Sequence, residues 1–320
     1  MELSVIIPSR SEMFLQRTIQ DILEHREAET EVIAVLDGAW ADPPVEQNER
    51  VSVIYVNPSV GQRGAANLGA KIAKGRYIMK CDAHVSFDQG FDRKMLEGFK
   101  ETGDNVTAVP DMRNLHAFSW KCYHCGWKGY QSHTPEKCGD PKCGKSDRLK
   151  RKIEWIGKSN PQSVSYSFDS EPHFAYFNDY KKTEKYQKDL ETGFTETMSL
   201  QGSCFMCTRK LYWKLKMCDE KMGNWGNQGI ELACKTWLSG RKVLVNHNTW
   251  YAHMFRTTGD FSFPYELPGR EVQKTKARVW ETITKSKLVE QKYPVSWLVE
   301  RFGCPGWSQE QLDKLKESEK

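Results

Sequence analysis

The chain has 320 residues, of which 38% are hydrophobic and 28% are charged, and its formal net charge is +5. This length is enough for a sizeable core in one or two domains, and the modest positive charge permits binding to polyanions without requiring it. No run reaches the roughly 18 apolar residues that cross a membrane, and the first residues lack the pattern of a signal peptide. We therefore expect a cytoplasmic protein with no membrane partner and no obligate protein partner.

The first 85 residues predict alternating strands and helices. Apolar runs of strand length lie at Leu3–Pro8, Glu31–Leu36, Val51–Val56 and Tyr77–Cys81. Apolar residues at helical spacing predict helices over 14–23 and 64–74. Strands joined by helices form a parallel sheet, and ligands bind at the carboxyl ends of its strands. Polar side chains follow three of these strands, which predicts a site there: Ser9, Arg10, Asp37 and Asp82.

Residues 116–150 break this pattern, because they are rich in cysteine, lysine and glycine and poor in aliphatic residues. Cys122-x2-Cys125, a 12-residue gap and Cys138-x4-Cys143 supply four thiolates, the ligand set of a structural Zn²⁺. A segment this polar would fold around the metal. The basic run from Lys137 to Lys158 and the nearby aromatic residues suit nucleic acid. The insertion is thus either a stabilising element or a polyanion-binding module.

The later chain contains apolar segments from Thr197 to Phe255 and a proline-containing tail with helical stretches. Cys204-x2-Cys207 has no second pair nearby, so we interpret it as strand packing. In the tail, Ser308 and Gln311 have the spacing of a capping box, which predicts the start of a helix.

The segment Asp82-Ala83-His84 is a candidate metal site. Both side chains lie just past a predicted strand and can reach one ion, and a carboxylate with an imidazole favours Mn²⁺ over Mg²⁺. Alone the pattern is common by chance, and a structural role is the alternative.

Several further segments, taken in order, carry a resemblance to a known family. They are Ser4–Arg10, Ile33–Gly38, Gly64–Ala70, Lys74–His84, Gly202–Met206, Trp225-Gly226, Trp237–Gly240 and His253-x-x-Arg256. Together they resemble family 2 glycosyltransferases of the GT-A fold, of the type common in phages (a host-cytoplasmic location if so), similar to the polypeptide N-acetylgalactosaminyltransferase branch. The resemblance implies an α/β fold with a Rossmann-like nucleotide-binding half, a mixed central sheet, a zinc-ribbon insertion and a helical tail.

The resemblance also implies domain bounds and residue roles. The expected parts are a nucleotide-sugar-binding half (1–115), the zinc ribbon (116–150), an acceptor-side half (151–260) and a helical extension (261–320). Mn²⁺ would be held by Asp82, His84 and His253. The UDP-sugar would contact Pro8, Ser9, Arg10, Asp37, Arg63, Asn67, Asp82 and Arg256, with Arg256 neutralising the diphosphate as a bidentate donor. Trp225 and Glu231 would lie on the sugar and acceptor side.

Some of these residues have simpler interpretations. Asn67 would cap a helix, Trp225 would be a core aromatic residue, His253 a strand histidine and Arg256 a surface cation.

One departure from the family concerns the general base. Inverting members carry an acid where this chain has Gln228 and Gly229, and a glutamine cannot accept a proton. We therefore expect transfer with retention, in which the leaving phosphate takes the acceptor's proton. Glu231 would serve as the base if the loop register differs.

The acceptor stays open between three hypotheses. The favoured one is a 5-hydroxymethylpyrimidine in DNA, turned out of the duplex, because of the ribbon, the basic run and the phage-type resemblance. The second is a protein or cell-surface glycan. The third, of another class, is a non-catalytic zinc-ribbon protein that binds nucleic acid.

Overall fold

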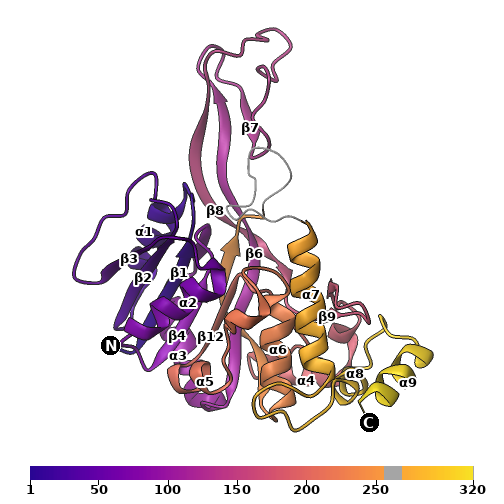
Figure 1. The fold of residues 1–320 in the computed structure, drawn as a ribbon. Helices are drawn as coiled ribbons and strands as arrows, with labels where there is room; N and C mark the ends of the chain where they lie inside the picture. Colours follow the sequence, from indigo (N-terminus) through magenta and orange to yellow (C-terminus); the bar gives the residue numbers. More distant parts are fainter. Residues whose placement is uncertain (256–268, 320) are drawn as a thin grey trace.

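A computed structural model describes residues 1–255 and 269–319 (Figure 1). The strands are β1 (Leu3–Ser9), β2 (Thr30–Asp37), β3 (Val51–Val56), β4 (Tyr77–Cys81), β5 (Val85–Phe87), β6 (Val106–Cys122), β7 (Lys128–Tyr130), β8 (Leu149–Ser163), β9 (Tyr166–Phe168), β10 (Phe174–Tyr176), β11 (Phe194–Glu196), β12 (Cys204–Thr208) and β13 (Lys242–His253). The helices are α1 (Leu15–His25), α2 (Gly61–Ile72), α3 (Phe91–Thr102), α4 (Glu184–Leu190), α5 (Arg209–Lys214), α6 (Gln228–Leu238), α7 (Gly269–Thr284), α8 (Val295–Phe302) and α9 (Gln309–Ser318).

The central sheet is mixed, with the order β11-β13-β6-β12-β4-β1-β2-β3. β1 pairs in parallel with both β2 and β4, and β2 with β3, which forms the predicted parallel part. β12 is antiparallel to β4 and β6, whereas β13 is parallel to β6. This arrangement brings the ends of β1, β4 and β13 to one region, although β13 lies more than 150 residues after β4 in the chain.

Both faces of the sheet are covered, and its strands are accordingly apolar on both sides. Val5 and Ile7 belong to the core cluster that contains residues of α1 and α3, whereas Ile6 belongs to the cluster that contains residues of α2, α5 and α6. Helices α7, α8 and α9 add to the second layer through Val279, Leu298 and Leu315. The site therefore stands on a rigid, two-sided core.

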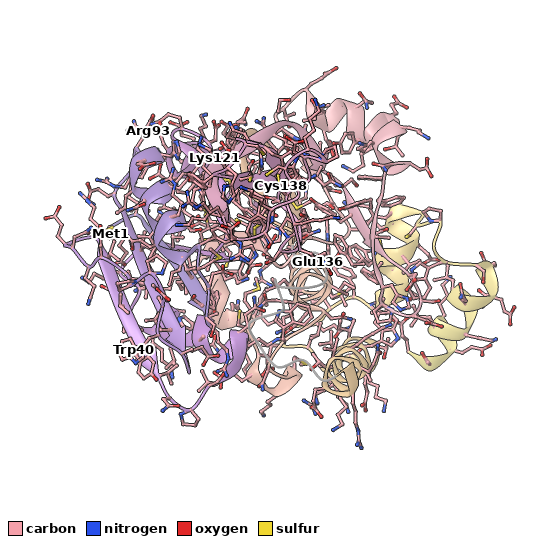
Figure 2. All side chains as sticks on the ribbon, turned by 90° about the horizontal axis from the view of Figure 1, so that it is seen from above. Met1, Trp40, Arg93, Lys121, Glu136 and Cys138 are labelled. Carbon is pink, nitrogen blue, oxygen red and sulfur yellow. The ribbon has the colours of Figure 1, made fainter. Side chains whose placement is uncertain are left out.

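An arm projects from this body and is built from the outer parts of β6 and β8 with β7 (Figure 1). Seen from above, the arm residues Lys121, Glu136 and Cys138 lie over the middle of the molecule (Figure 2). A third cluster of buried residues, which includes Phe118, Trp120 and Trp155, fills the junction of arm and body. The long strands run through positions 115/116 and 150/151, so the arm continues the central sheet.

Several local predictions are confirmed. The GT-A-like α/β arrangement, the four early strands and the capping box of Ser308 and Gln311 are present. Cys204 and Cys207 are buried strand residues. Helix α2 begins at Gly61, three residues before the predicted start, because Asp37 fixes the preceding loop by accepting hydrogen bonds from Ser59 and Val60.

Among the helices within 1–255 and 269–319, none combines the length and the apolar character needed to cross a membrane.

Candidate active site

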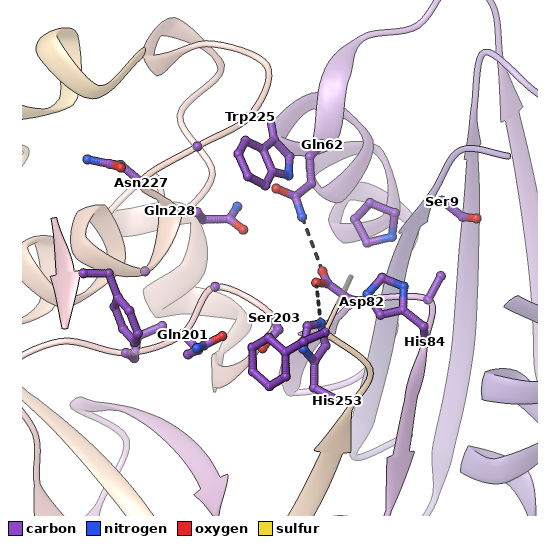
Figure 3. A pocket seen from close by; sticks show the side chains of 18 of the residues that line it. Ser9, Gln62, Asp82, His84, Gln201, Ser203, Trp225, Asn227, Gln228 and His253 are labelled. Carbon is purple, nitrogen blue, oxygen red and sulfur yellow. Dashed lines mark hydrogen bonds and ion pairs between the residues drawn. The ribbon is translucent and has the colours of Figure 1, made fainter. Parts of the chain in front are cut away.

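A cavity of about 380 Å³ opens at the carboxyl ends of β1 and β4, a size typical of small-molecule sites. Its lining comes from the end of β1 and the loop after it, the start of α2, the segment after β4, the first residue of β10, the segment before β12, the segment 225–230 and the end of β13. These residues include Pro8, Ser9, Arg10, Glu12, Gln62, Asp82, His84, Gly202, Ser203, Trp225, Gln228 and His253. In Figure 3, Trp225 and Gln228 lie across the cavity from Asp82.

Asp82, His84 and His253 come together in this cavity, and their ligand atoms all lie within 4.8 Å of one another. Asp82 and His84 follow β4 directly, whereas His253 ends β13, which pairs with β5 through His253 and Val85. His253 Nε2 lies 3.4 Å from Asp82 Oδ2 (Figure 3). Apart from this long contact, neither ring nitrogen of the buried His253 has a hydrogen-bond partner among the described residues. Such an orphaned imidazole beside a carboxylate fits a divalent cation.

Neighbouring groups fix the orientation and the charge of these side chains. Glu12 Oε2 lies 2.9 Å from His84 Nδ1, which leaves Nε2 of His84 available to a metal ion, and such carboxylate–histidine pairs orient metal ligands. Burial lowers the pKa of His253. Asp82 raises this pKa and His84 lowers it further, and the net effect is a pKa below the usual value, so the imidazole stays neutral at pH 7. A metal ligand must be neutral imidazole.

Lys80 is a buried cation beneath the site. Its Nζ lies 2.5 Å from Asp82 Oδ1 and 2.8 Å from the carbonyl oxygen of Gly202. Burial would raise the pKa of Asp82, but the charge of Lys80 and the two imidazoles outweigh it and hold the pKa well below its usual range. Asp82 is therefore ionised throughout the neutral range.

Arg63 and Glu231 lie outside the cavity, which differs from their predicted contacts with donor and acceptor. Both side chains are almost fully buried and bind each other, with Arg63 Nη2 2.7 Å from Glu231 Oε2. Arg63 also donates to the carbonyl oxygens of Gly223 and Gly226, and Lys235 binds the other carboxylate oxygen of Glu231. The pair therefore fixes the segment that carries Trp225, because its polar atoms are used up within the protein.

Asp37 and Asn67 are also held by the protein. Asp37 is fully buried and accepts hydrogen bonds from Ser59 Oγ (2.8 Å) and the Val60 amide (2.7 Å). Asn67 joins α2 to the segment 218–220, because it donates to the Cys218 carbonyl oxygen. It is not a helix cap, and neither residue lines the cavity. Arg256 lies outside the described residues.

Gln228 and Gly229 begin α6 at the cavity wall. Gln228 lines the cavity, and its buried Oε1 has no hydrogen-bond partner among the described residues. A Cβ on Gly229 would stand 1.9 Å from the Leu200 carbonyl oxygen, so no acidic side chain fits there. Trp225 is a partly exposed cavity residue and not a core aromatic residue.

Three neighbours of Asp82, His84 and His253 were not predicted from the sequence: Glu12, Gln62 and Lys80. Glu12 lies in the loop after β1, two residues beyond Arg10, and this position next to predicted site residues is the sequence signal that could have identified it. Gln62 Nε2 lies 3.4 Å from Asp82 Oδ1. Lys80 could have been predicted from its position, because a lysine within a buried apolar strand needs a charged or hydrogen-bonding partner.

A second group of side chains that could hold one metal ion lies in the arm: Cys122, Cys125, Cys138 and Cys143. The Sγ atoms of Cys125 and Cys138 are 3.5 Å apart, and those of Cys122 and Cys143 are 3.9 Å apart. Thiolates around one tetrahedral Zn²⁺ would be about 3.8 Å apart, given Zn–S bonds of about 2.3 Å. Backbone N–H groups of Cys125 and His124 lower the pKa of Cys122 to about 6, against the effect of burial. The donor set fits zinc.

The comparisons with known proteins agree with this geometry. Residues 4–142 match the model of glycosyl transferase family 2. Polypeptide N-acetylgalactosaminyltransferase 3 of Homo sapiens is 24% identical over 274 residues, which cover 82% of this chain and 38% of that protein. Probable N-acetylgalactosaminyltransferase 6 of Caenorhabditis elegans is 27% identical over 295 residues, which cover 87% and 41%.

Among solved structures, the crystal structure of GalNAc-T7 with UDP, GalNAc and Mn²⁺ superposes with a TM-score of 0.62 at 16% identity. The superposition covers 99% of this chain and 55% of the GalNAc-T7 chain, and it supports the GT-A fold. The chain spans about 40% of the length of the two curated relatives described above.

Proposed function

We propose that this chain, in which residues 4–142 match glycosyl transferase family 2, transfers a sugar from a UDP-sugar to a hydroxyl acceptor with the help of a divalent metal ion. The observation that carries the proposal is the convergence of Asp82, His84 and His253 at the carboxyl ends of the strands, where the buried ring nitrogens of His253 lack hydrogen bonds. The related structure that contains UDP, GalNAc and Mn²⁺ supports this donor and this metal.

The chain's own residues would divide the work as follows. Asp82, His84 and His253 would hold the ion, Glu12 would orient His84, and Lys80 would keep Asp82 ionised. Bound there, a divalent cation would offset the charge of the diphosphate leaving group. Pro8, Ser9 and Arg10 would line the nucleotide side of the same cavity, opposite Trp225.

Retention of configuration is the stereochemical outcome that we favour. Among the described residues, the carboxylates that line the cavity are Glu12 and Asp82, and both bind other groups of the site. Glu231 is committed to Arg63 and Lys235, so it is a poor candidate for a general base. With no such base, the departing phosphate would accept the proton of the attacking hydroxyl.

Two acceptor classes follow from different observations. The names of the relatives favour a polypeptide hydroxyl. The basic segment from Lys137 to Lys158 instead favours a hydroxymethylpyrimidine in DNA, since its cations suit phosphates. A screen of several UDP-sugars against peptides and hydroxymethylated DNA, with Mn²⁺ and mass-spectrometric readout, decides between them.

The metal site is tested with Asp82→Asn and His253→Ala. We expect each to weaken Mn²⁺ binding, measured by calorimetry, by more than about tenfold and to abolish release of UDP from the donor. Asp88→Asn is the matched control, since this carboxylate pairs with Lys94 away from the cavity. Unchanged UDP release in both site variants would refute the assignment of the metal site, whereas no UDP release by the unmodified chain would favour a non-catalytic scaffold.

A further inference from the structure

The positive charge of the chain is concentrated in the arm. Residues 116–163 contain ten lysines and arginines against four acidic residues, a net charge of +6. The rest of the chain, with 37 cations and 38 acids, carries −1. A Zn²⁺ bound by four thiolates would subtract two charges and leave the arm at +4. The arm is thus a basic element on a nearly neutral body.

The strand register places four lysines of the arm, Lys121, Lys128, Lys150 and Lys152, on one face. Lys121 of β6 pairs directly with Lys150 of β8 and with Lys128 of β7, which makes a row about 10 Å wide across three strands. The next row on this face holds Lys152, Ser119 and Tyr130. We call these residues, together with Lys158, the basic face.

The basic face lacks charge partners. No ion pair of Lys121, Lys128, Lys150, Lys152 or Lys158 occurs within residues 1–255 and 269–319. Like charges directly opposite each other on neighbouring strands destabilise a sheet. A row of three such lysines therefore costs stability unless an external anion offsets the repulsion.

Aromatic rings lie among these cations. Tyr130 is 50% exposed, and Lys158 Nζ lies 5.1 Å from its ring centre. Tyr123 is 52% exposed, with Lys121 Nζ 5.0 Å from its ring centre. Rings among cations can stack against bases while lysines bind phosphates, and stacking needs bases that are unpaired.

The other face of the arm differs. Arg151 covers the rings of Phe118 and Trp120 there, so it holds the apolar side of the arm together. This separates Arg151 from its neighbours Lys150 and Lys152, although all three belong to one basic run in the sequence. The two faces thus have different roles.

The basic face also leads towards the active site. Tyr130 lines a second pocket of about 160 Å³ at the base of the arm, together with Asn114, Gln131, Met254, Phe255 and His253. His253 and Phe255 also line the main cavity. A chain bound along the face would therefore reach the wall of the candidate active site.

We propose that the basic face binds single-stranded nucleic acid and guides it towards the second pocket. Binding of the strand does not depend on the transfer reaction, so the two proposals can fail separately.

The test is fluorescence anisotropy of the full chain with a labelled single-stranded oligonucleotide and with a duplex of the same sequence. We expect tighter binding of the single strand, and a binding constant that falls with salt. The variant Lys121→Gln/Lys128→Gln/Lys150→Gln/Lys152→Gln should reduce the slope of log K against log salt by about 0.7 for each phosphate that no longer binds a lysine. Tyr130→Ala should weaken binding about tenfold, and Tyr130→Phe should not.

The control variant replaces three lysines of the body by glutamine, at Lys71, Lys74 and Lys188. It should bind the oligonucleotide as tightly as the wild type does. UDP release and zinc content are measured on every variant to show that the fold persists. Equal binding by wild type and the four-lysine variant would overturn the proposal. Tighter retention of heparin than of the oligonucleotide, with no effect of Tyr130→Ala, would overturn it in favour of a general polyanion surface. Weakened oligonucleotide binding by the four-lysine variant, with unchanged UDP release, would support the proposal and leave the proposed transfer reaction intact.

Discussion

The buried group of Arg63, Glu231 and Lys235 is the most consequential difference between prediction and structure at the scale of single residues. We predict that Glu231→Gln lowers the free energy of unfolding by about 3–5 kcal/mol, because it leaves buried cations without their carboxylate. Urea denaturation measures this loss. Glu220→Gln, at an exposed partner of Asn67, is the control and should cost less than about 1 kcal/mol.

The same variant separates a structural from a catalytic role. If Glu231 is structural, the folded fraction of Glu231→Gln should still bind Mn²⁺ and release UDP. A variant with wild-type stability and no transfer would instead make Glu231 the general base.

The distance along the chain explains which site residues could be predicted. Asp82 and His84 are two residues apart after one strand, so their proximity follows from local sequence. The contact of Arg63 with Glu231 joins residues 168 apart, and that of Glu12 with His84 joins residues 72 apart. No periodicity or spacing reveals such pairs. His253 was predicted to lie beside Asp82 and His84 only from the resemblance to a family.

At the scale of elements, an ion pair ties the C-terminal helices to the sheet. Glu196 of β11 is buried, and Arg301 of α8 lies 2.7 Å from its Oε2. Burial would raise the pKa of Glu196, but the hydrogen bond and charge of Arg301, with Lys185 and Lys242, lower it below 4.5. The pair's contribution to stability is therefore complete above about pH 4.5 and is lost as the pH falls through the depressed pKa.

We accordingly predict that Glu196→Gln lowers the free energy of unfolding by about 2 kcal/mol at pH 7. The difference from wild type should shrink as the pH falls below about 4.5, because the wild-type carboxyl then becomes protonated. Urea titrations from pH 3 to pH 7 measure it. Glu310→Gln, which removes an exposed pair with Lys314, should change stability by less than about 0.5 kcal/mol. A constant difference across this range would contradict the role of Glu196.

The arm shows where element prediction from sequence ended. The early strands are apolar on both faces and could be recognised as continuous runs. The outer parts of β6 and β8 alternate between a lysine-bearing face and an aromatic face, and their polar content masked two of the longest strands. Their pairing depends on a register between residues about 30 positions apart, which composition does not reveal.

At the scale of the whole molecule, the body and the arm depend on different forces. The body has a two-sided apolar core, whereas the tip of the arm has few buried side chains beyond the cysteine cluster. The ring of Trp127 fills the space beside Gly129 and Gly139, where a Cβ would stand 2.4 Å from it. This contact is too small to hold the two halves of the tip together by itself, so the tip depends on the four-cysteine cluster.

We therefore predict that Cys138→Ser removes about one zinc per chain and unfolds the tip of the arm without unfolding the body. Metal analysis and the fluorescence of Trp127, compared with a Trp127→Phe chain, measure the two effects.

Binding of the single-stranded oligonucleotide should fall with the zinc, because β7 carries Lys128 and Tyr130 and joins Cys125 to the rest of the cluster. Binding of Mn²⁺ should persist, because its ligands lie on body strands. Cys304→Ser, at a buried cysteine of the body, should leave the zinc content unchanged. If the zinc-free chain loses Mn²⁺ binding together with the arm, arm and body form one cooperative unit, and the separation of forces is wrong.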